Sequence, residues 1–260
     1  MLDPMKIMLE VLLLASALLI FRHAAGRHGR RFVIGFTAAT LVLNLAFYYF
    51  AAWPLYVTFG QSSGFDRSSL HAMVLFDVLK WGVFAYVFGR LAVGLGDAGL
   101  GGGFALLRSN PRFSRIAGVG IVGAALAIGA VYGLGFVEYR LGYLDALPWM
   151  WFKDDPVSFK LGLWGGLRNL AGEEILARLG VQSVLLYALR RTAGAPVLAI
   201  VFSSLYFEMW HNGFRELYFL NFVGSCGFGW AYQKGGYESA AIAHCLADWL
   251  LIVILPRLLL

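Results

Sequence analysis

Long apolar runs joined by short polar connections cover almost the whole sequence. A transmembrane helix needs about 20 mainly apolar residues, and most of these runs approach that length. We therefore predict an all-α, polytopic membrane protein of about eight transmembrane helices, folded as a single membrane domain over residues 1–260. The first run is interpreted as an uncleaved anchor rather than a signal peptide, because Glu10 interrupts it and the arginines follow it. The predicted spans are residues 5–21, 32–50, 70–89, 115–136, 161–189, 196–212, 216–232 and 238–256.

Composition supports this prediction, since hydrophobic residues make up 60% of the chain and charged residues 14%. Soluble domains have roughly 45–50% apolar and about 25% charged residues, so a water-soluble enzyme is excluded. The net charge of +6 does not indicate a nucleic-acid partner, because most basic residues gather in alternate connections. The positive-inside rule then predicts that both termini lie outside the cytoplasm. The long fourth connection, about 137–160, carries Trp149, Trp151, Asp154 and Asp155 and is predicted to be an interfacial segment.

Two cysteines and a glycine-rich run could suggest a metal, nucleotide or protease site, but each has a simpler structural explanation. Cys226 and Cys245 fall in apolar runs and are interpreted as small buried hydrophobes rather than a disulfide or metal pair. The glycine-rich run 94–99 has the GxGxxG spacing, but no strand precedes it, so a nucleotide site is not predicted. Asp97 in that run, together with Asp77, resembles the aspartate pair of presenilin-like proteases, yet Asp97 falls in a glycine loop. The run is interpreted as a flexible cytoplasmic linker.

Charged residues inside the predicted spans are costly in hydrocarbon and are therefore functional candidates. Glu173, Glu174 and Arg178 lie in the fifth predicted span. At about 100° per residue, Glu174 and Arg178 share a helix face one turn apart, which predicts an ion pair. Glu173 points about 100° away from Glu174 and is left for another partner. The alternative explanation of the two glutamates is that they only brace helix packing.

Two histidines in the last three predicted spans each have an acidic residue one helical turn away. His211 follows Glu208 by three residues, and Asp248 follows His244 by four. A single intramembrane histidine is usually a packing residue, whereas three such polar groups in succession favour a reaction site.

Spacing predicts which of these groups meet. Glu173 and His211 are equidistant from the connection between the fifth and sixth spans, so an antiparallel hairpin places them opposite each other. Straight helices leave His244 roughly 16 Å from His211 in depth. If all three groups act together, the hairpin at Asn212-Gly213 must be short or broken. A broken helix is tolerated in a membrane where it lines a water-filled cavity.

Three short motifs in the last four predicted spans are Glu173-Glu174-xxx-Arg178, Phe207-xxx-His211 and His244-xxx-Asp248. They resemble the EExxxR, FxxxH and HxxxN/D motifs of the CPBP intramembrane proteases, the CAAX protease and bacteriocin-processing or Abi family. The resemblance covers about residues 160–256, the predicted catalytic four-span core, whereas the four spans within residues 1–137 are not diagnostic. It implies a helical fold with a cavity in the membrane. It also implies hydrolysis of a peptide bond near the C-terminus, or the leader, of a membrane-associated protein.

The resemblance implies that Glu173 is the general base, with the attacking water held between it and His211. His244 and Asp248 then help to hold the water or the oxyanion. Because an aspartate has no proton to donate where many relatives carry asparagine, Asp248 is expected to orient His244. Imidazole N–H groups suit the stabilisation of an oxyanion in a water-poor cavity. Supporting roles fall on Glu174, Arg178 and Phe207.

A zinc-dependent variant of the same hydrolase is the alternative mechanism. Glu173, His211 and His244 match the pattern of a catalytic zinc site, which has three protein ligands and a water. The sequence lacks HExxH, however, and Arg178 with a second carboxylate is needed for Glu173 as a base but not for zinc. No cofactor or metal is therefore favoured, and zinc stays open.

Other functions also stay open. A non-catalytic immunity or scaffold protein is disfavoured by the intact motifs, a proton-coupled transporter by the absence of visible repeats, and a rhomboid-type serine protease by the spacing around Ser225. The expected partners are a membrane-anchored or lipidated protein substrate and the lipid bilayer, without nucleic acid. The expected location is multi-pass in a cell membrane, and a prokaryotic inner membrane fits best. The residues left without a role are Glu10, Asp77, Lys80 and Arg168.

Overall fold

The computed structural model describes residues 4–24, 29–53, 57, 66–108, 110–142, 156–211 and 219–255, except for the side chains of residues 21–24 and 156–162. All regular secondary structure in this part of the chain is helical, which confirms the predicted all-α class. The predicted interfacial segment around Trp149 to Asp155 and the predicted turn at Asn212-Gly213 lie outside the described residues.

Each predicted span coincides with helical structure, although several boundaries differ. The fourth span extends beyond its prediction to Arg140, and the third begins at Arg67 and continues to Asp97. The fold consists of α1 (Pro4–Ala24), α2 (Arg30–Phe47), η1 (Tyr48–Ala52), α4 (Arg67–Asp97), η2 (Ala105–Leu107), α5 (Phe113–Arg140), α6 (Pro156–Leu170), η4 (Ile175–Gln182), α7 (Ser183–Ala188), α8 (Ala195–His211), α9 (Phe219–Gly235), α10 (Tyr237–Asp248) and η5 (Trp249–Ile254).

The fifth predicted span, residues 161–189, is not one continuous helix. Helix α6 ends at Leu170, Ala171 and Gly172 form a turn, and the chain becomes helical again at Glu173 before the π-helix η4. The apolar run gave no sign of this break, because an isolated glycine is tolerated within a helix. The break places Glu173 at the start of a new helical segment.

Among the described helices, four are long and apolar enough to cross a membrane: Arg30–Ala52, Arg67–Asp97, Phe113–Arg140 and Tyr237–Ile254. Helices α8 and α9 have 17 residues each. Many large apolar side chains face outwards, as lipid-facing side chains do, and Leu19, Val42 and Phe76 are at least 65% exposed. These features are those of a multi-pass membrane protein.

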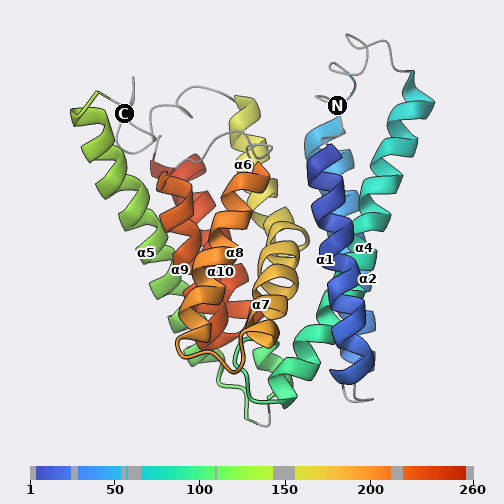
Figure 1. The fold of residues 1–260 in the computed structure, drawn as a ribbon. Helices are drawn as coiled ribbons and strands as arrows, with labels where there is room; N and C mark the ends of the chain where they lie inside the picture. Colours follow the sequence, from blue (N-terminus) through green and yellow to red (C-terminus); the bar gives the residue numbers. More distant parts are fainter. Residues whose placement is uncertain are drawn as a thin grey trace.

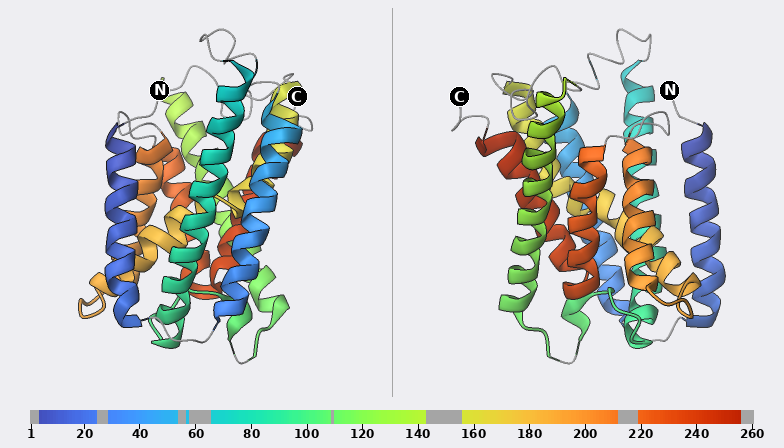
Figure 2. Two further views of the ribbon diagram at one scale, coloured as in Figure 1. Left: turned by 90° about the vertical axis from the view of Figure 1, so that its right-hand side faces the viewer. Right: turned by 60° about the vertical axis from the view of Figure 1, so that its left-hand side comes forward.

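The helices surround a central segment made of α6, η4 and α7 (Figure 1). Helices α1, α2 and α4 lie along one side and appear together in Figure 2, while α5, α9, α10 and α8 form the other. Helix α4 packs against α1, α2 and η4. The contact of α5 with α9 and α10 is built from small residues, including Ala124, Ala127, Ala231 and Ala243, so these three backbones approach closely.

The glycine-rich run 94–99 is mostly helical, which corrects its interpretation as a flexible linker. Residues 94–97 belong to α4 itself. The following glycines have positive φ angles, and the carbonyl of Gly103 accepts a hydrogen bond of 2.7 Å from the amide of Tyr237. The segment therefore docks on the turn between α9 and α10.

Candidate active site

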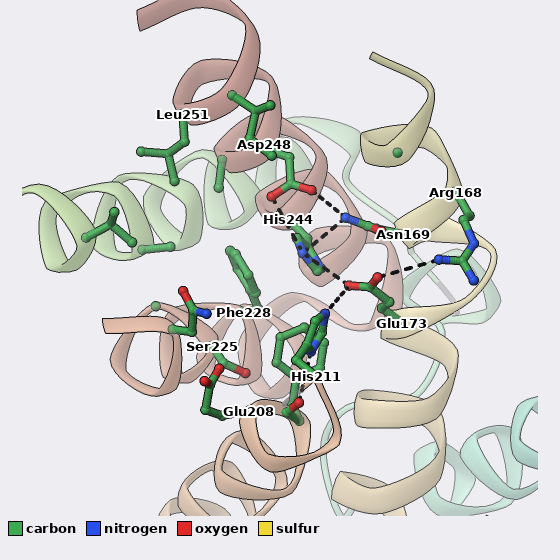
Figure 3. A pocket seen from close by; sticks show the side chains of 18 of the residues that line it. Arg168, Asn169, Glu173, Glu208, His211, Ser225, Phe228, His244, Asp248 and Leu251 are labelled. Atoms are coloured by element: carbon green, nitrogen blue, oxygen red, sulfur yellow. Dashed lines mark hydrogen bonds and ion pairs between the residues drawn. The ribbon is translucent and has the colours of Figure 1, made fainter. Parts of the chain in front are cut away.

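A cavity of about 500 Å³ lies among α5, α6, α8, α9 and α10 (Figure 3). All four predicted catalytic residues, together with Phe207, line its wall. Glu174 and Arg178 lie behind that wall with no exposed surface. The polar residues of the wall are Arg168, Asn169, Glu173, Glu208, His211, Asn221, Ser225, His244 and Asp248.

The turn at Ala171 and Gly172 is held by two side chains from distant helices. The amide of Asn44 on α2, which is fully buried, donates a hydrogen bond of 2.6 Å to the carbonyl of Ala171. The hydroxyl of Tyr237 on α10 donates to the carbonyl of Leu170. A helix end in an apolar setting leaves carbonyls without partners. These two donors supply them, so the break that presents Glu173 is fixed by tertiary contacts.

Glu173 and His211 face each other, as the spacing of the hairpin predicts. Oε2 of Glu173 lies 3.3 Å from Nε2 of His211. The Nδ1 of His211 lies 3.0 Å from the carbonyl of Phe207, one turn earlier in α8. With Nδ1–H donating to that carbonyl, the orientation of the ring is fixed and Nε2 is directed at Glu173.

His244 reaches the same carboxylate. Its Nε2 lies 3.8 Å from Oε2 of Glu173, so the predicted depth difference of roughly 16 Å is wrong at the level of the side chains. That prediction assumed straight, parallel helices. The ring of Phe207 packs against both imidazoles, with centroids 4.3 Å from His211 and 5.7 Å from His244, and Phe228 stacks on His244 at 4.4 Å.

The orientation of His244 depends on Glu174 rather than on Asp248 alone. Nδ1 of His244 lies 2.9 Å from Oε1 of Glu174, whereas Asp248 lies 3.8 Å from the other ring nitrogen, Nε2. A carboxylate that accepts from one imidazole nitrogen fixes the ring and leaves the other nitrogen free to act. Nε2 of His244 is thereby turned towards the cavity (Figure 3).

The predicted ion pair between Glu174 and Arg178 is confirmed, at 3.3 Å between Oε2 and Nε, and both side chains are completely buried. The remaining donors of Arg178 are bound as well. Its Nη2 donates to the carbonyl and the hydroxyl of Ser225 at 3.0 and 2.7 Å, and its Nη1 contacts the hydroxyls of Ser203 and Ser204 at 3.2 and 3.5 Å. Ser225, considered above as a nucleophile, is thus a ligand of this guanidinium.

Asn169 is a member of the site that the sequence did not single out. Its amide lies 3.2 Å from Nε2 of His244 and also donates to Oδ2 of Asp248. It therefore joins the two residues of the third motif to α6. The available signal was weak: one uncharged polar residue, four positions before Glu173 in a predicted span.

The three residues of the alternative zinc set, Glu173, His211 and His244, lie close together. Within the described residues, no group of three or more His, Cys, Asp or Glu side chains has the arrangement of a metal site. The two Nε2 atoms instead converge on Oε2 of Glu173, as the distances above show. Cys226, half-buried, and Cys245, buried, are both free thiols, in line with the sequence interpretation that they form no disulfide.

Comparison with known proteins identifies a family to which part of the chain is similar. Residues 156–250 match a family model described as type II CAAX prenyl endopeptidase Rce1-like. The matched segment runs from α6 to the beginning of η5, and it contains all three motifs and the residues that line most of the cavity. Searches among curated proteins and among solved structures return no match.

Proposed function

We propose that the chain is an intramembrane endopeptidase with Glu173 as its general base, because residues 156–250 match the CAAX prenyl endopeptidase family model. The observation that carries the proposal is the position of Glu173, with one carboxylate oxygen between two imidazoles on a cavity wall. The substrate is a membrane-anchored or lipidated protein, cleaved near its C-terminus or leader.

The reaction follows from these positions. Glu173 takes a proton from a water molecule in the cavity, and the water oxygen attacks the carbonyl carbon of the scissile peptide bond. The charge that develops on the carbonyl oxygen is stabilised by Nε2–H of His211 and of His244, both in the protonated form because Nδ1–H of each ring is already bound. The low dielectric of the cavity strengthens this interaction. When the C–N bond breaks, Glu173 returns the proton to the leaving amine. Asp248 and Asn169 keep His244 in place.

We further infer that the chain crosses the membrane eight times, with both termini on the non-cytoplasmic side. Helix α1 begins and η5 ends at one end of the bundle, while α7 and α9 end at the other (Figure 1). Arg190 and Arg191 follow the end of α7, and Lys234 lies in the last turn of α9. This arrangement supports a basic, cytoplasmic end. Labelling of single cysteines introduced at Asn110 and Gly142, which flank α5, tests it with a membrane-impermeant maleimide on intact cells. Only the cysteine at Gly142 is expected to react, and the reverse result would overturn the orientation.

The test of the peptidase is a comparison of protein termini. Membranes containing the wild-type chain, Glu173→Gln or His211→Gln are analysed by mass spectrometry, and Glu138→Gln on α5 serves as a matched carboxylate control outside the cavity. New termini are expected with the wild type and the control and not with the other two variants. Incorporation of one ¹⁸O atom from labelled water into the new carboxylate identifies hydrolysis. Identical termini in all four samples would refute the proposal.

Zinc dependence is tested on the same purified protein. Activity that survives dialysis against 1,10-phenanthroline, at a metal content well below one ion per chain, supports Glu173 as the base. Stoichiometric zinc that is lost together with activity would replace this mechanism by the zinc-dependent one, with Glu173, His211 and His244 as ligands.

A further inference from the structure

Four charged residues inside the bundle have no part in the reaction above: Glu10 on α1, Asp77 and Lys80 on α4, and Arg168 on α6. They form a continuous series of ion pairs. Nζ of Lys80 lies 3.6 Å from Oε2 of Glu10 and 3.1 Å from Oδ1 of Asp77. Nη2 of Arg168 lies 3.9 Å from Oδ2 of Asp77, and its Nη1 lies 3.8 Å from Oε1 of Glu173. The series therefore ends on the proposed base.

Glu173 is contacted through both of its oxygens. Oε2 faces Nε2 of His211 at 3.3 Å, and Oε1 faces Arg168. Figure 3 shows the guanidinium and the imidazole on opposite sides of the carboxylate. A carboxylate held from one side only is free to rotate about its last bond. Arg168 thus determines whether Oε2 stays directed at the imidazoles.

Arg168 is itself held in place by α2, η1 and α4. Its guanidinium carbon lies 5.1 Å from the ring centroid of Phe47 and 5.9 Å from those of Tyr48 and Trp81. Asp77, its partner, accepts hydrogen bonds from the hydroxyl of Tyr48 and from Nε1 of Trp81, the latter at 3.2 Å. The carboxylate of Asp77 is therefore a fixed anchor.

The other end of the series reaches the neighbour of His211. Oε1 of Glu10 accepts a hydrogen bond of 3.0 Å from Nε1 of Trp210, and the ammonium of Lys6 lies 3.4 Å from the Trp210 ring centroid. The ring of Trp210 lies 5.2 Å from that of His211. The ion-pair series thus contacts Glu173 directly through Arg168, and it contacts Trp210, the neighbour of His211, through Glu10.

Helix packing alone does not account for these charges. Ionisable groups in a membrane are costly, and a buried ion pair stabilises a fold no better than well-packed apolar residues do. Three of the four residues lie outside the segment that matches the family. We propose that Arg168 is a positioning residue for Glu173, and that Asp77, fixed by Lys80 and Glu10, holds Arg168 in register. The inference rests on the proposed function, and it makes α1 and α4 part of the peptidase.

The test compares kcat and KM for Arg168→Gln, Arg168→Lys, Asp77→Asn and the double variant Arg168→Gln/Asp77→Asn. The probe is a fluorogenic peptide spanning the terminus that the wild type cleaves in membranes. Misplacement of a reacting group by about 1 Å costs up to roughly 100-fold in rate. We expect kcat to fall about 10- to 100-fold in both single uncharged variants, with KM changed less than about twofold. Arg168→Lys should recover part of the loss because it retains the charge.

The double variant separates positioning from general damage. If Asp77 acts through Arg168, the double variant is about as slow as Arg168→Gln alone, because coupled residues are not additive. Arg140→Gln, at the exposed end of α5, is the matched control and should keep the wild-type kcat. If Asp77→Asn fails to fold in detergent, Lys80→Met replaces it in the comparison, because Lys80 is the next member of the ion-pair series after Asp77.

Two results would overturn the inference. One is a loss of kcat in the double variant equal to the product of the losses in the two single variants. The other is a loss of kcat that only follows the fraction of folded protein. Wild-type kcat in both Arg168→Gln and Asp77→Asn, beside an inactive Glu173→Gln, would overturn this inference and leave the proposed function standing. Cleavage by Glu173→Gln would instead refute the proposed function.

Discussion

Replacing Arg178 by Met should destabilise the bundle strongly, because it leaves the buried carboxylate of Glu174 without its guanidinium partner and with His244 alone. Both side chains have no exposed surface, and Arg178 also binds Ser203, Ser204 and Ser225. Removing one partner of a buried ion pair costs about 3–5 kcal/mol. At about 1.4 kcal/mol per factor of ten, this shifts the unfolding equilibrium by roughly two to four powers of ten.

The companion variant identifies the cause. In Arg178→Met/Glu174→Gln the buried charge is gone, while the amide oxygen still accepts from Nδ1 of His244. About half of the lost free energy should therefore return, even though one more residue is changed. Unfolding by titration with SDS in mixed micelles measures both values. Arg140→Met is the control, and as an exposed substitution it should stay within about 0.5 kcal/mol of the wild type.

Two results would refute this reasoning. One is a free energy of unfolding for Arg178→Met within about 1 kcal/mol of the wild type. The other is a double variant no more stable than the single one, which would mean that the hydrogen bonds to the serines, and not the unpaired carboxylate, dominate the loss.

Three further expectations concern packing and the site. Gly227→Ala should cost about 1–3 kcal/mol in the same SDS titration, since a Cβ there would meet a backbone carbonyl of α5 at 2.9 Å, whereas Gly133→Ala, with nothing within 4 Å, should be close to neutral. Asn44→Leu should cost about 1–3 kcal/mol because the carbonyl of Ala171 loses its donor, and an unchanged unfolding midpoint would argue against this. In the peptide assay, Asp248→Asn should retain activity within about tenfold of the wild type, because its side-chain oxygen still accepts from the amide of Asn169. Asp248→Leu cannot accept this hydrogen bond and should lose more activity than Asp248→Asn. Equal rates for the two variants would contradict this expectation.

The sequence predicted contacts within one helix or one hairpin well, and contacts between helices distant in the sequence incompletely. The i,i+4 spacing was sufficient for the ion pair of Glu174 with Arg178, and the hairpin spacing for the meeting of Glu173 with His211. It did not reveal that Glu174 also binds His244, because that contact depends on how α10 crosses η4. The depth estimate for His244 failed for the same reason, since spacing along a chain measures only straight, parallel helices.

The break after Leu170 and the ion-pair series through Arg168 were also beyond a sequence prediction. The break occurs within an apolar run, and its carbonyl partners come from residues more than 60 positions away, Asn44 and Tyr237. Asp77 is one turn from Lys80 on α4, yet the approach of α6 to that turn follows from the packing of α2 and α4 around it. A charged residue in a predicted span indicates that it needs a partner of opposite charge, but the sequence does not identify that partner.

The anchoring of the turn by Tyr237 has a consequence for the order in which the protein becomes competent. Synthesis proceeds from the N-terminus, so the segment with Glu173 enters the membrane before α10 exists. Until α10 arrives, the carbonyl of Leu170 lacks its donor and Glu174 lacks His244. The proposed hydrolytic centre is therefore complete only once α10 has packed against this turn, because α10 supplies both of these contacts.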